Sequence, residues 1–273
     1  MVRALFVTVM KKILLKFYLI SYLVFTLLLI PKLLFSEPKN KEFIISSYIG
    51  GVSLAKGKIS LHFKDNKYDL KVYANSVGIF SLFLDWSQKL NSSGMIKKNS
   101  FYSSNYFSKD QRGKKVGYIE IDFSKSPPLI ISAQPDPRED TRREILKSFL
   151  KNVNDPVAGV FNLASNRCNK VIEIYDGKRR YNLKINSKKI SSVNHSFLGV
   201  DEIKTYKCNF EINRLAGYTK KELEKFPQKG EMWIKKYGES NLYYPIKIRI
   251  ETKWGNFLCL IKEKEFKNES DSL

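Results

Sequence analysis

Three cations follow an Asp-Gly pair in the segment CNKVIEIYDGKRRYNLKI, residues 168–185. Lys178, Arg179 and Arg180 could form a site for phosphate or another anion, because ammonium and guanidinium groups donate charge-assisted hydrogen bonds. The same residues could instead form the outer surface of a β-hairpin, since Asp-Gly between alternating apolar residues favours a two-residue type I′ turn. The pairing of the two strands separates these interpretations.

A type I′ turn centred on Asp176-Gly177 would fix that pairing. Arg180 then lies opposite Glu173, and the two side chains form a cross-strand ion pair on the water-facing side of the hairpin. Lys178 lies opposite Tyr175 on the same side, and its aliphatic chain covers the ring. Both cations are explained by the hairpin alone.

Arg179 differs from its neighbours because it falls in the register of the apolar face, opposite Ile174. The end of the strand could let its side chain swing into solvent. Alternatively, the guanidinium lies at the mouth of the concave face, where it binds an anionic headgroup or closes a buried polar network. Tyr181 shares this face, so Arg179 and Tyr181 are the candidate ligand-binding residues. The other members of the face are Cys168, Ile172, Leu183 and Ile185.

The cysteines suggest one disulfide. Cys168 and Cys208 both fall on the apolar side of a predicted strand and are 40 residues apart. In an oxidising compartment we expect them to be bridged, which would stabilise the fold by about 3–4 kcal/mol, and we expect Cys259 to be a small buried apolar residue. His62 and His195 lie far apart without a carboxylate framework, so we expect no metal site.

Catalytic motifs are absent from the sequence: it contains no nucleophile elbow, phosphate-binding loop, metalloprotease helix or dinucleotide fingerprint. Asp136, Glu139 and Asp140 could be paired carboxylates, but acids at these positions are typical of the first turn of a helix. We therefore assign no catalytic residue and no cofactor. This interpretation favours a non-enzymatic protein and leaves catalysis open.

The N-terminus has the pattern of an export signal. Lys11, Lys12 and Lys16 precede an apolar run over residues 17–31, and the small residue Ser36 follows. We therefore expect the protein in the periplasm or elsewhere in the cell envelope.

The domain organisation follows from that segment. We expect residues 1–36 to be a signal peptide or, if uncut, an anchor that contacts the membrane. Residues 37–266 would form one β-rich domain, and residues 267–273 a disordered tail. The formal net charge of +21 permits anionic partners, but the lysines are dispersed along the chain, which argues against nucleic acid.

Alternation of apolar and polar residues dominates the rest of the chain and predicts strands. KGKISLHF and KYDLKVYA flank a short polar loop and should form a hairpin, and YYPIKIRIETKWGNFLCLI should form another. The fold class is therefore mainly β: a curved antiparallel sheet or partly open β-barrel with two or three short helices.

Three short helices are expected from their N-terminal signals. One runs from Pro137 through Leu150 behind Asp136, a second follows Asp155-Pro156, and a third follows Thr219. The apolar stretch over residues 77–86 fits either a helix or a strand.

Several of these features together resemble an uncharacterised family of exported proteobacterial proteins, catalogued as domain of unknown function 3108. Residues 176–181, DGKRRY, are similar to the family's central motif, and NDPVAGVFNL resembles its DP-x-S-A-L helix. The resemblance covers about residues 43–263. It implies a β-rich envelope protein and supplies no agreed catalytic residues. Further landmarks that agree are Tyr48, Gly50, Gly51, Tyr68, Gly78, Trp86, Gly94 and Tyr106.

Three classes of function remain. We favour a non-enzymatic envelope protein whose curved sheet binds a lipid-like or other amphiphilic anion, or a partner chain of the envelope. The second class is an envelope enzyme or assembly accessory that acts on cell-wall glycan or lipid through acid–base chemistry. The third is a structural scaffold. A hollow interior would favour ligand binding, and a filled interior a scaffold.

Overall fold

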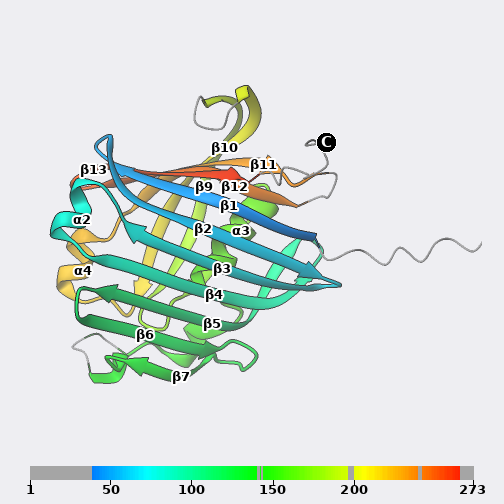
Figure 1. Cartoon of the computed structure of the whole chain (residues 1–273). Coiled ribbons are helices and arrows are strands. Elements are labelled where there is room, and N and C mark those ends of the chain that lie inside the picture. The colour runs from blue at the N-terminus through cyan, green and yellow to red at the C-terminus, as the bar shows by residue number, and fades with distance from the viewer. Residues whose placement is uncertain (1–38, 140–141, 143, 196–199, 239–241, 265–273) are drawn as a thin grey trace, which may run out of the picture. The chain divides into compact units, whose positions relative to one another are not determined.

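The computed structural model describes residues 39–139, 142, 144–195, 200–238 and 242–264. The expected signal peptide or anchor and the expected C-terminal tail lie outside these residues. Strands dominate the described part of the chain and form one antiparallel sheet of 13 strands (Figure 1).

Seven strands follow one another in the N-terminal half, and each pairs with the next. They are β1 (Lys39–Ile49), β2 (Val52–Lys64), β3 (Lys67–Ser76), β4 (Trp86–Lys97), β5 (Ser100–Arg112), β6 (Lys115–Asp122) and β7 (Leu129–Gln134). The predicted hairpin around residues 64–66 is confirmed, with Lys64 opposite Lys67.

Six strands form the C-terminal half. They are β8 (Ile172–Tyr175), β9 (Arg180–His195), β10 (Val200–Ala216), β11 (Lys229–Lys236), β12 (Tyr243–Thr252) and β13 (Gly255–Glu263). The predicted final hairpin is confirmed as β12 and β13, with Thr252 opposite Gly255 and the turn at Lys253 and Trp254.

The order of the strands explains the shape of the sheet. β1 pairs with β2 on one side and with β13 on the other, which joins the two halves. The sheet curves strongly (Figure 1). It does not close into a barrel, because β7 and β8 are edge strands that do not pair with each other. The predicted class, a mainly β fold with a partly open barrel, is confirmed.

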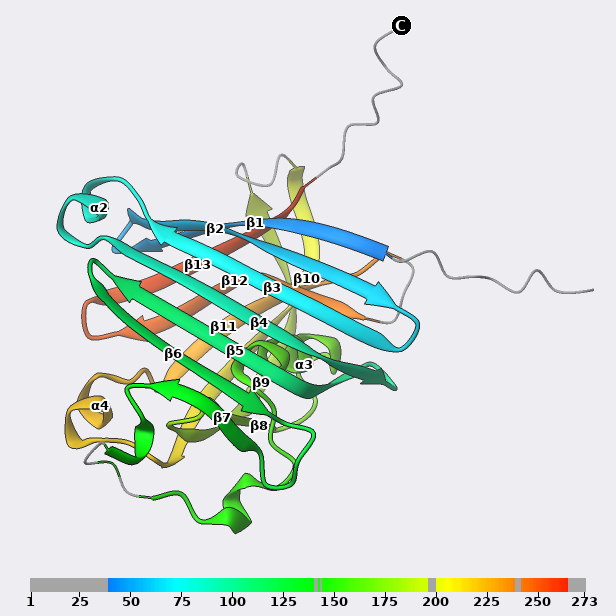
Figure 2. The ribbon, with the colours of Figure 1, turned by 60° about the horizontal axis from the view of Figure 1, so that its bottom comes forward.

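Helix α3 (Pro156–Ser165) fills the concave side of this sheet (Figure 2). It contacts β4 and β5 in one half and β8 and β12 in the other. Val157, Ala158 and Phe161 join one hydrophobic core, and Leu163 and Ala164 join a second. The middle of the barrel is therefore occupied by packed side chains.

The N-terminal signals predicted two of the three helices correctly. Asp155 caps α3 with Pro156 at its first position, and Thr219 forms a capping box with Glu222 at the start of α4 (Lys220–Lys225). Residues 77–86 contain one helical turn, α2 (Ile79–Phe83), which has no buried residue. None of the helices in the described residues is long and apolar enough to cross a membrane.

The helix expected over residues 137–150 is wrong. The described residues of this stretch form two short 3-10 helices, η1 (Pro137–Glu139) and η2 (Lys147–Leu150). Arg142 instead hydrogen-bonds the backbone carbonyl of Gly217, and Leu150 is buried in the first core. Helix propensities of ordinary residues differ by only a few tenths of a kcal/mol. Tertiary contacts of this kind stabilise the observed conformation by more than that and therefore override the propensity.

The structure joins Cys168 and Cys208 by a disulfide in the second core, between the end of α3 and β10. Cys259 is a free thiol that packs against the first core and is half-buried. Burial raises the pKa of the Cys259 thiol to about 11, despite a hydrogen bond with Ser47. The thiol is therefore protonated at neutral pH and a weak nucleophile.

Candidate functional site

The turn between β8 and β9 has four residues, Asp176 to Arg179, and Tyr175 pairs with Arg180 across it. The prediction of a two-residue type I′ turn is therefore wrong. Such a turn needs a positive φ at both Asp176 and Gly177, and of these two residues only Gly177 has one, at 87°. The Asp176 carboxylate holds the wider turn. Its Oδ1 accepts the backbone N–H groups of Lys178 at 2.9 Å and Arg179 at 2.6 Å.

The wider turn moves the register by two residues, so that Ile174 lies opposite Tyr181 and Glu173 opposite Asn182. Because side chains alternate with period two, this shift leaves the predicted faces unchanged. The predicted apolar face is buried at Ile172 and Leu183 and belongs to the second core.

The face predicted to meet water is partly covered, which corrects the sequence analysis for Tyr175 and Arg180. Tyr175 is buried, and the Arg180 side chain is only 4% exposed. The predicted ion pair of Arg180 with Glu173 is confirmed, with 2.9 Å between nitrogen and oxygen, but it is diagonal across the strands. Arg180 Nε also donates to the backbone carbonyl of Phe149 in η2 at 2.8 Å. The η2 segment, remote in sequence, therefore covers part of this side of the hairpin.

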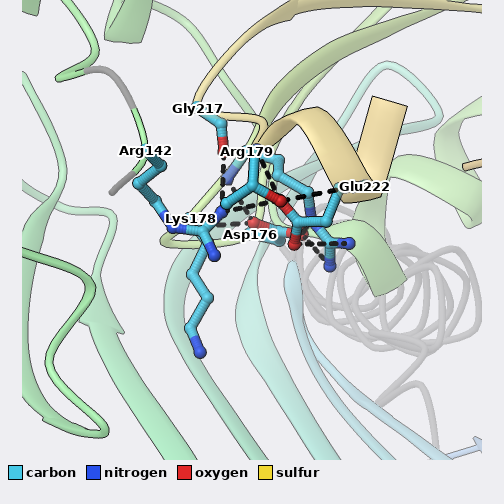
Figure 3. Close-up of polar contacts among 7 residues, drawn as sticks. Arg142, Asp176, Lys178, Arg179, Gly217 and Glu222 are labelled. Atoms are coloured by element: carbon cyan, nitrogen blue, oxygen red, sulfur yellow. Dashed lines mark hydrogen bonds and ion pairs between the residues drawn. The ribbon is translucent and has the colours of Figure 1, made fainter. Parts of the chain in front are cut away.

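Arg179 lies in a polar cluster at the turn, with 29% of its side chain exposed. Its Nε donates to Asp176 Oδ2 at 2.8 Å, and its Nη1 lies 3.8 Å from Glu222 Oε1. The guanidinium carbon lies 5.1 Å from the centre of the Phe226 ring, which suits a cation–π contact. The side chain is thus held in place, whereas the Lys178 side chain points away from the cluster (Figure 3).

Glu222 links this cluster to the start of α4. One of its oxygens, Oε2, accepts the backbone N–H of Thr219 at 2.9 Å in the capping box and a hydrogen bond from Arg142 Nη1 at 3.0 Å. Arg142 Nη1 donates to the Gly217 carbonyl as well, at 2.7 Å (Figure 3). Three segments distant in sequence therefore meet at the turn that carries Arg179.

Arg179 and Tyr181, the two candidate residues, line one pocket of about 500 Å³. The pocket lies where β4–β7 meet the β8–β9 turn, and the Phe226 ring borders it with its centre 5.7 Å from that of Tyr181. Among its other lining residues are Gln88, Leu90, Tyr106, Ser108, Asp110, Arg112, Tyr118, Ile119, Gln134, Asp176 and Lys178.

A second hollow of about 440 Å³ lies on the α4 side and shares Arg179 and Phe226 with the first. Its remaining lining includes the cations Arg142, Lys221 and Lys225. Arg179 and Phe226 therefore lie between a pocket with aromatic walls and a more basic surface hollow.

Three ionisable groups of the pocket, Tyr106, Tyr181 and Arg179, have raised pKa values. Burial raises the pKa of the Tyr106 and Tyr181 phenols well above the usual value, and nearby Asp176 adds to the effect on both. Burial alone would lower the pKa of Arg179, but the Asp176 and Glu222 carboxylates raise it. At neutral pH Tyr106 and Tyr181 therefore keep their hydroxyl protons and Arg179 keeps its charge, and all three can donate hydrogen bonds.

Asp155 is a buried acid beside this pocket that fixes α3 to the sheet. Its Oδ1 accepts the backbone N–H groups of Val157 and Ala158, at 2.8 and 2.9 Å. Its Oδ2 accepts the hydroxyl groups of Ser92 and Ser103, at 2.7 and 2.6 Å. Burial raises the pKa of Asp155 even though all four hydrogen bonds lower it.

Several residues of the site were not predicted from the sequence. Glu222 was expected only as a helix cap, and nothing in the sequence indicated that Phe226 would contact Arg179. Tyr106 appeared only as a landmark of the family resemblance. The described residues contain no group of three or more His, Cys, Asp and Glu side chains that could hold a metal ion.

Comparisons with known proteins give a family and similarity to solved structures. No curated protein matches the sequence. A solved structure that matches is the crystal structure of a beta-barrel-like protein of domain of unknown function DUF1849 from Brucella abortus, with 5% identity and a TM-score of 0.42. The match covers 84% of this chain and 98% of that one. Residues 43–260 match the family described as protein of unknown function (DUF3108), and the chain belongs to that family.

Proposed function

We propose that this protein is a non-enzymatic protein of the cell envelope that binds an anionic amphiphile in the pocket lined by Arg179 and Tyr181. The observation that carries the proposal is the convergence of both residues, from one edge of the sheet, on a pocket bordered by β4–β7 and Phe226. Its volume of about 500 Å³ suits a small ligand or part of a larger one.

The charges around Arg179 suit an amphiphile with an anionic head. Its Nε and Nη2 are directed at Asp176, whereas Nη1 is 3.8 Å from the nearest Glu222 oxygen, which is too long for a strong hydrogen bond. An anion in the basic hollow beside Arg142 and Lys221 would gain Nη1 as a donor. The apolar part of the ligand would then contact Phe226 and the Tyr181 ring.

The protonation states support binding rather than catalysis. General acid–base catalysis is most efficient when a group titrates near the working pH. In the pocket the pKa values of Tyr106, Tyr181 and Arg179 are all raised, although the usual pKa values of these side chains already lie far above neutral pH. These groups are suited to recognise a ligand and keep their protons.

The location in the envelope has two supports. The N-terminal sequence has the pattern of an export signal. Cys168 and Cys208 form a disulfide, and such bonds persist in oxidising compartments.

A structural scaffold is the second candidate, and one observation favours it. Helix α3 and the two cores fill the middle of the barrel, so that a long acyl chain has no open path through it. Any ligand of the pocket must therefore stay at the end of the barrel.

Calorimetric titration of the purified protein with monododecyl phosphate, below its micelle concentration, tests the proposal. We expect saturable binding that is at least tenfold weaker in Arg179→Gln, with Tyr181→Phe weaker to a smaller extent. Lys184→Gln is the matched control, since Lys184 is an exposed cation on β9 outside the pocket. Absence of saturable binding, or equal binding by Arg179→Gln and the wild type, would overturn the proposal. Dodecyl maltoside, the neutral analogue, should bind more weakly than the phosphate.

A further inference from the structure

We propose that one end of the sheet, which we call the α2 end, docks on the surface of an anionic lipid bilayer. The α2 end consists of the connections at residues 50–51, 77–85, 113–114 and 253–254. Antiparallel pairing brings them together, because Ile49 pairs with both Val52 and Phe257. Figure 2 shows α2 and the turns of the β12–β13 and β5–β6 hairpins at this same end.

Large apolar side chains are exposed at the tips of these connections. Leu82 and Phe83 in α2 are 79% and 84% exposed, and Trp254 at the β12–β13 turn is 63% exposed. Ile79 and Val52 are exposed beside them. Scattered exposed apolar residues are ordinary, but apolar side chains at several neighbouring tips indicate a surface that is covered in use.

The opposite end of the sheet provides a comparison within the same molecule. There the β2–β3 turn is Asp65-Asn66 and the β4–β5 turn is Lys98-Asn99, and the β6–β7 connection, after the buried Phe123, continues with Ser124, Lys125 and Ser126. Polar tips of this kind are what water-facing turns usually carry. The apolar tips of the α2 end are therefore a property of that end and not of the turns in general.

Exposed lysines flank the apolar tips at two of the connections, and we use their charge to infer the partner. Lys253 lies over the Trp254 ring at 4.9 Å, and Lys114 and Lys115 are exposed at the β5–β6 turn. Rings and aliphatic side chains can enter the headgroup region of a bilayer while the flanking lysines bind lipid phosphates. Apolar tips flanked by lysines suit an anionic lipid surface better than the apolar centre of a protein interface, where lysine is depleted.

The pocket of Arg179 lies towards the same end. Its lining residues Gln88, Arg112 and Gln134 come from the ends of β4, β5 and β7 that adjoin the α2 end. Docking there would bring the pocket close to the lipid headgroups. The docking inference rests on the exposed residues alone and does not require the pocket to be occupied.

Vesicle flotation with a chain that begins at residue 38 tests the inference. This chain lacks the N-terminal apolar run, which could bind vesicles by itself, and it keeps every described strand, both cores and the disulfide. We expect binding to vesicles of 30% phosphatidylglycerol in phosphatidylcholine, and at least tenfold weaker binding to phosphatidylcholine alone. The fluorescence emission of Trp254 should shift to shorter wavelength on binding, relative to a Trp254→Ser variant.

Two variants make the test specific for the α2 end. The double substitution Leu82→Ser and Phe83→Ser should weaken vesicle binding at least tenfold, without loss of thermal stability, since neither side chain is buried. Leu129→Ser is the matched control because Leu129 is 53% exposed at the opposite end of the sheet, on β7. Lack of vesicle binding by the wild type, or unchanged binding by the double variant, would overturn the inference.

Arg179→Gln separates this inference from the proposed function. It should bind vesicles as the wild type does, while losing affinity for monododecyl phosphate. If Arg179→Gln lost both, the vesicle binding would come from the pocket, and docking through the apolar tips would be overturned.

Discussion

The guanidinium of Arg179 donates to the carboxylate of Asp176 with 2.8 Å between Nε and Oδ2, so the charge of Arg179 is partly neutralised by its own turn. The same carboxylate shapes that turn, because its other oxygen accepts two backbone N–H groups. Asp176 therefore has two separable roles: its Oδ1 sets the conformation of the turn, and its negative charge limits how strongly Arg179 attracts an anion.

Asp176→Asn separates these roles. An amide oxygen can accept the two backbone N–H groups of Lys178 and Arg179, so the turn should persist, but the charge that competes with an anionic ligand is gone. We expect monododecyl phosphate to bind Asp176→Asn several times more tightly than the wild type, as measured by calorimetry. Asp176→Ala is the contrast, since it removes both roles and should lower the melting temperature. Weaker binding by Asp176→Asn would mean that the Asp176 charge assists the ligand.

Asp155 is expected to be needed for its hydrogen bonds more than for its charge. Asp155→Ala removes the cap of α3 and leaves the Ser92 and Ser103 hydroxyls without their acceptor, so it should lower the free energy of unfolding by about 3 kcal/mol. Asp155→Asn can still cap the helix, and the two hydroxyls can rotate to accept from its amide, so its cost should be below about 1 kcal/mol. Urea unfolding measures both, and equal losses would contradict this assignment.

The raised pKa of Asp155 predicts a dependence of stability on pH. As pH rises, the unfolded chain loses this proton first, while the folded protein keeps it, so the contribution of Asp155 to stability falls until the pH passes the folded pKa. Asn does not titrate. The unfolding free energy of the wild type should therefore decrease relative to Asp155→Asn as the pH rises above about 3.9, the pKa of an unfolded aspartate. A relative increase over that range would show that the pKa is lowered in the fold.

Local patterns in the sequence predicted those parts of the fold that depend on neighbouring residues. The caps of α3 and α4 were correct because a cap is formed by a side chain and N–H groups within three residues. The faces of the β8–β9 hairpin were correct even though the turn was wrong, because a shift of two residues preserves the alternation of side chains.

Contacts between remote segments could not be predicted in the same way. Arg180 was expected to face water because its own hairpin leaves that face open, but the remote residue Phe149 hydrogen-bonds its side chain from that side. The expected helix over residues 137–150 failed for a related reason, since Arg142 and Leu150 reach partners elsewhere in the fold. The pocket is bordered by Phe226, which follows α4 and meets Arg179 because β9 pairs with β10 and places Arg180 opposite Ala216, just before α4.

The disulfide is expected to be a major source of stability. It closes a loop of 40 residues, so replacing Cys168 and Cys208 by Ala should lower the free energy of unfolding by about 3–4 kcal/mol in the chain-entropy model. Cys259→Ala is the control, since that thiol is free. Thiol labelling of unfolded, non-reduced protein should modify Cys259 alone. Labelling of all three cysteines would contradict the bridge.

Gly217 supports the Arg179 turn by close approach, and a matched glycine shows how to test this. A methyl group added at Gly217 would meet the backbone carbonyl oxygen of Lys178 at 2.1 Å, whereas at Gly113 it would meet nothing within 4 Å. Both glycines have positive φ, +76° and +56°, so each Ala substitution should cost about 1 kcal/mol in backbone strain. Gly217→Ala must also displace the Lys178 carbonyl and should cost about 3 kcal/mol in total. Urea unfolding measures the difference in stability between the two variants. Gly217→Ala should also bind monododecyl phosphate more weakly, because the displaced Lys178 adjoins Arg179, whereas Gly113→Ala should bind it as the wild type does. Equal destabilisation by the two substitutions would show that the turn can move away from Gly217 without cost.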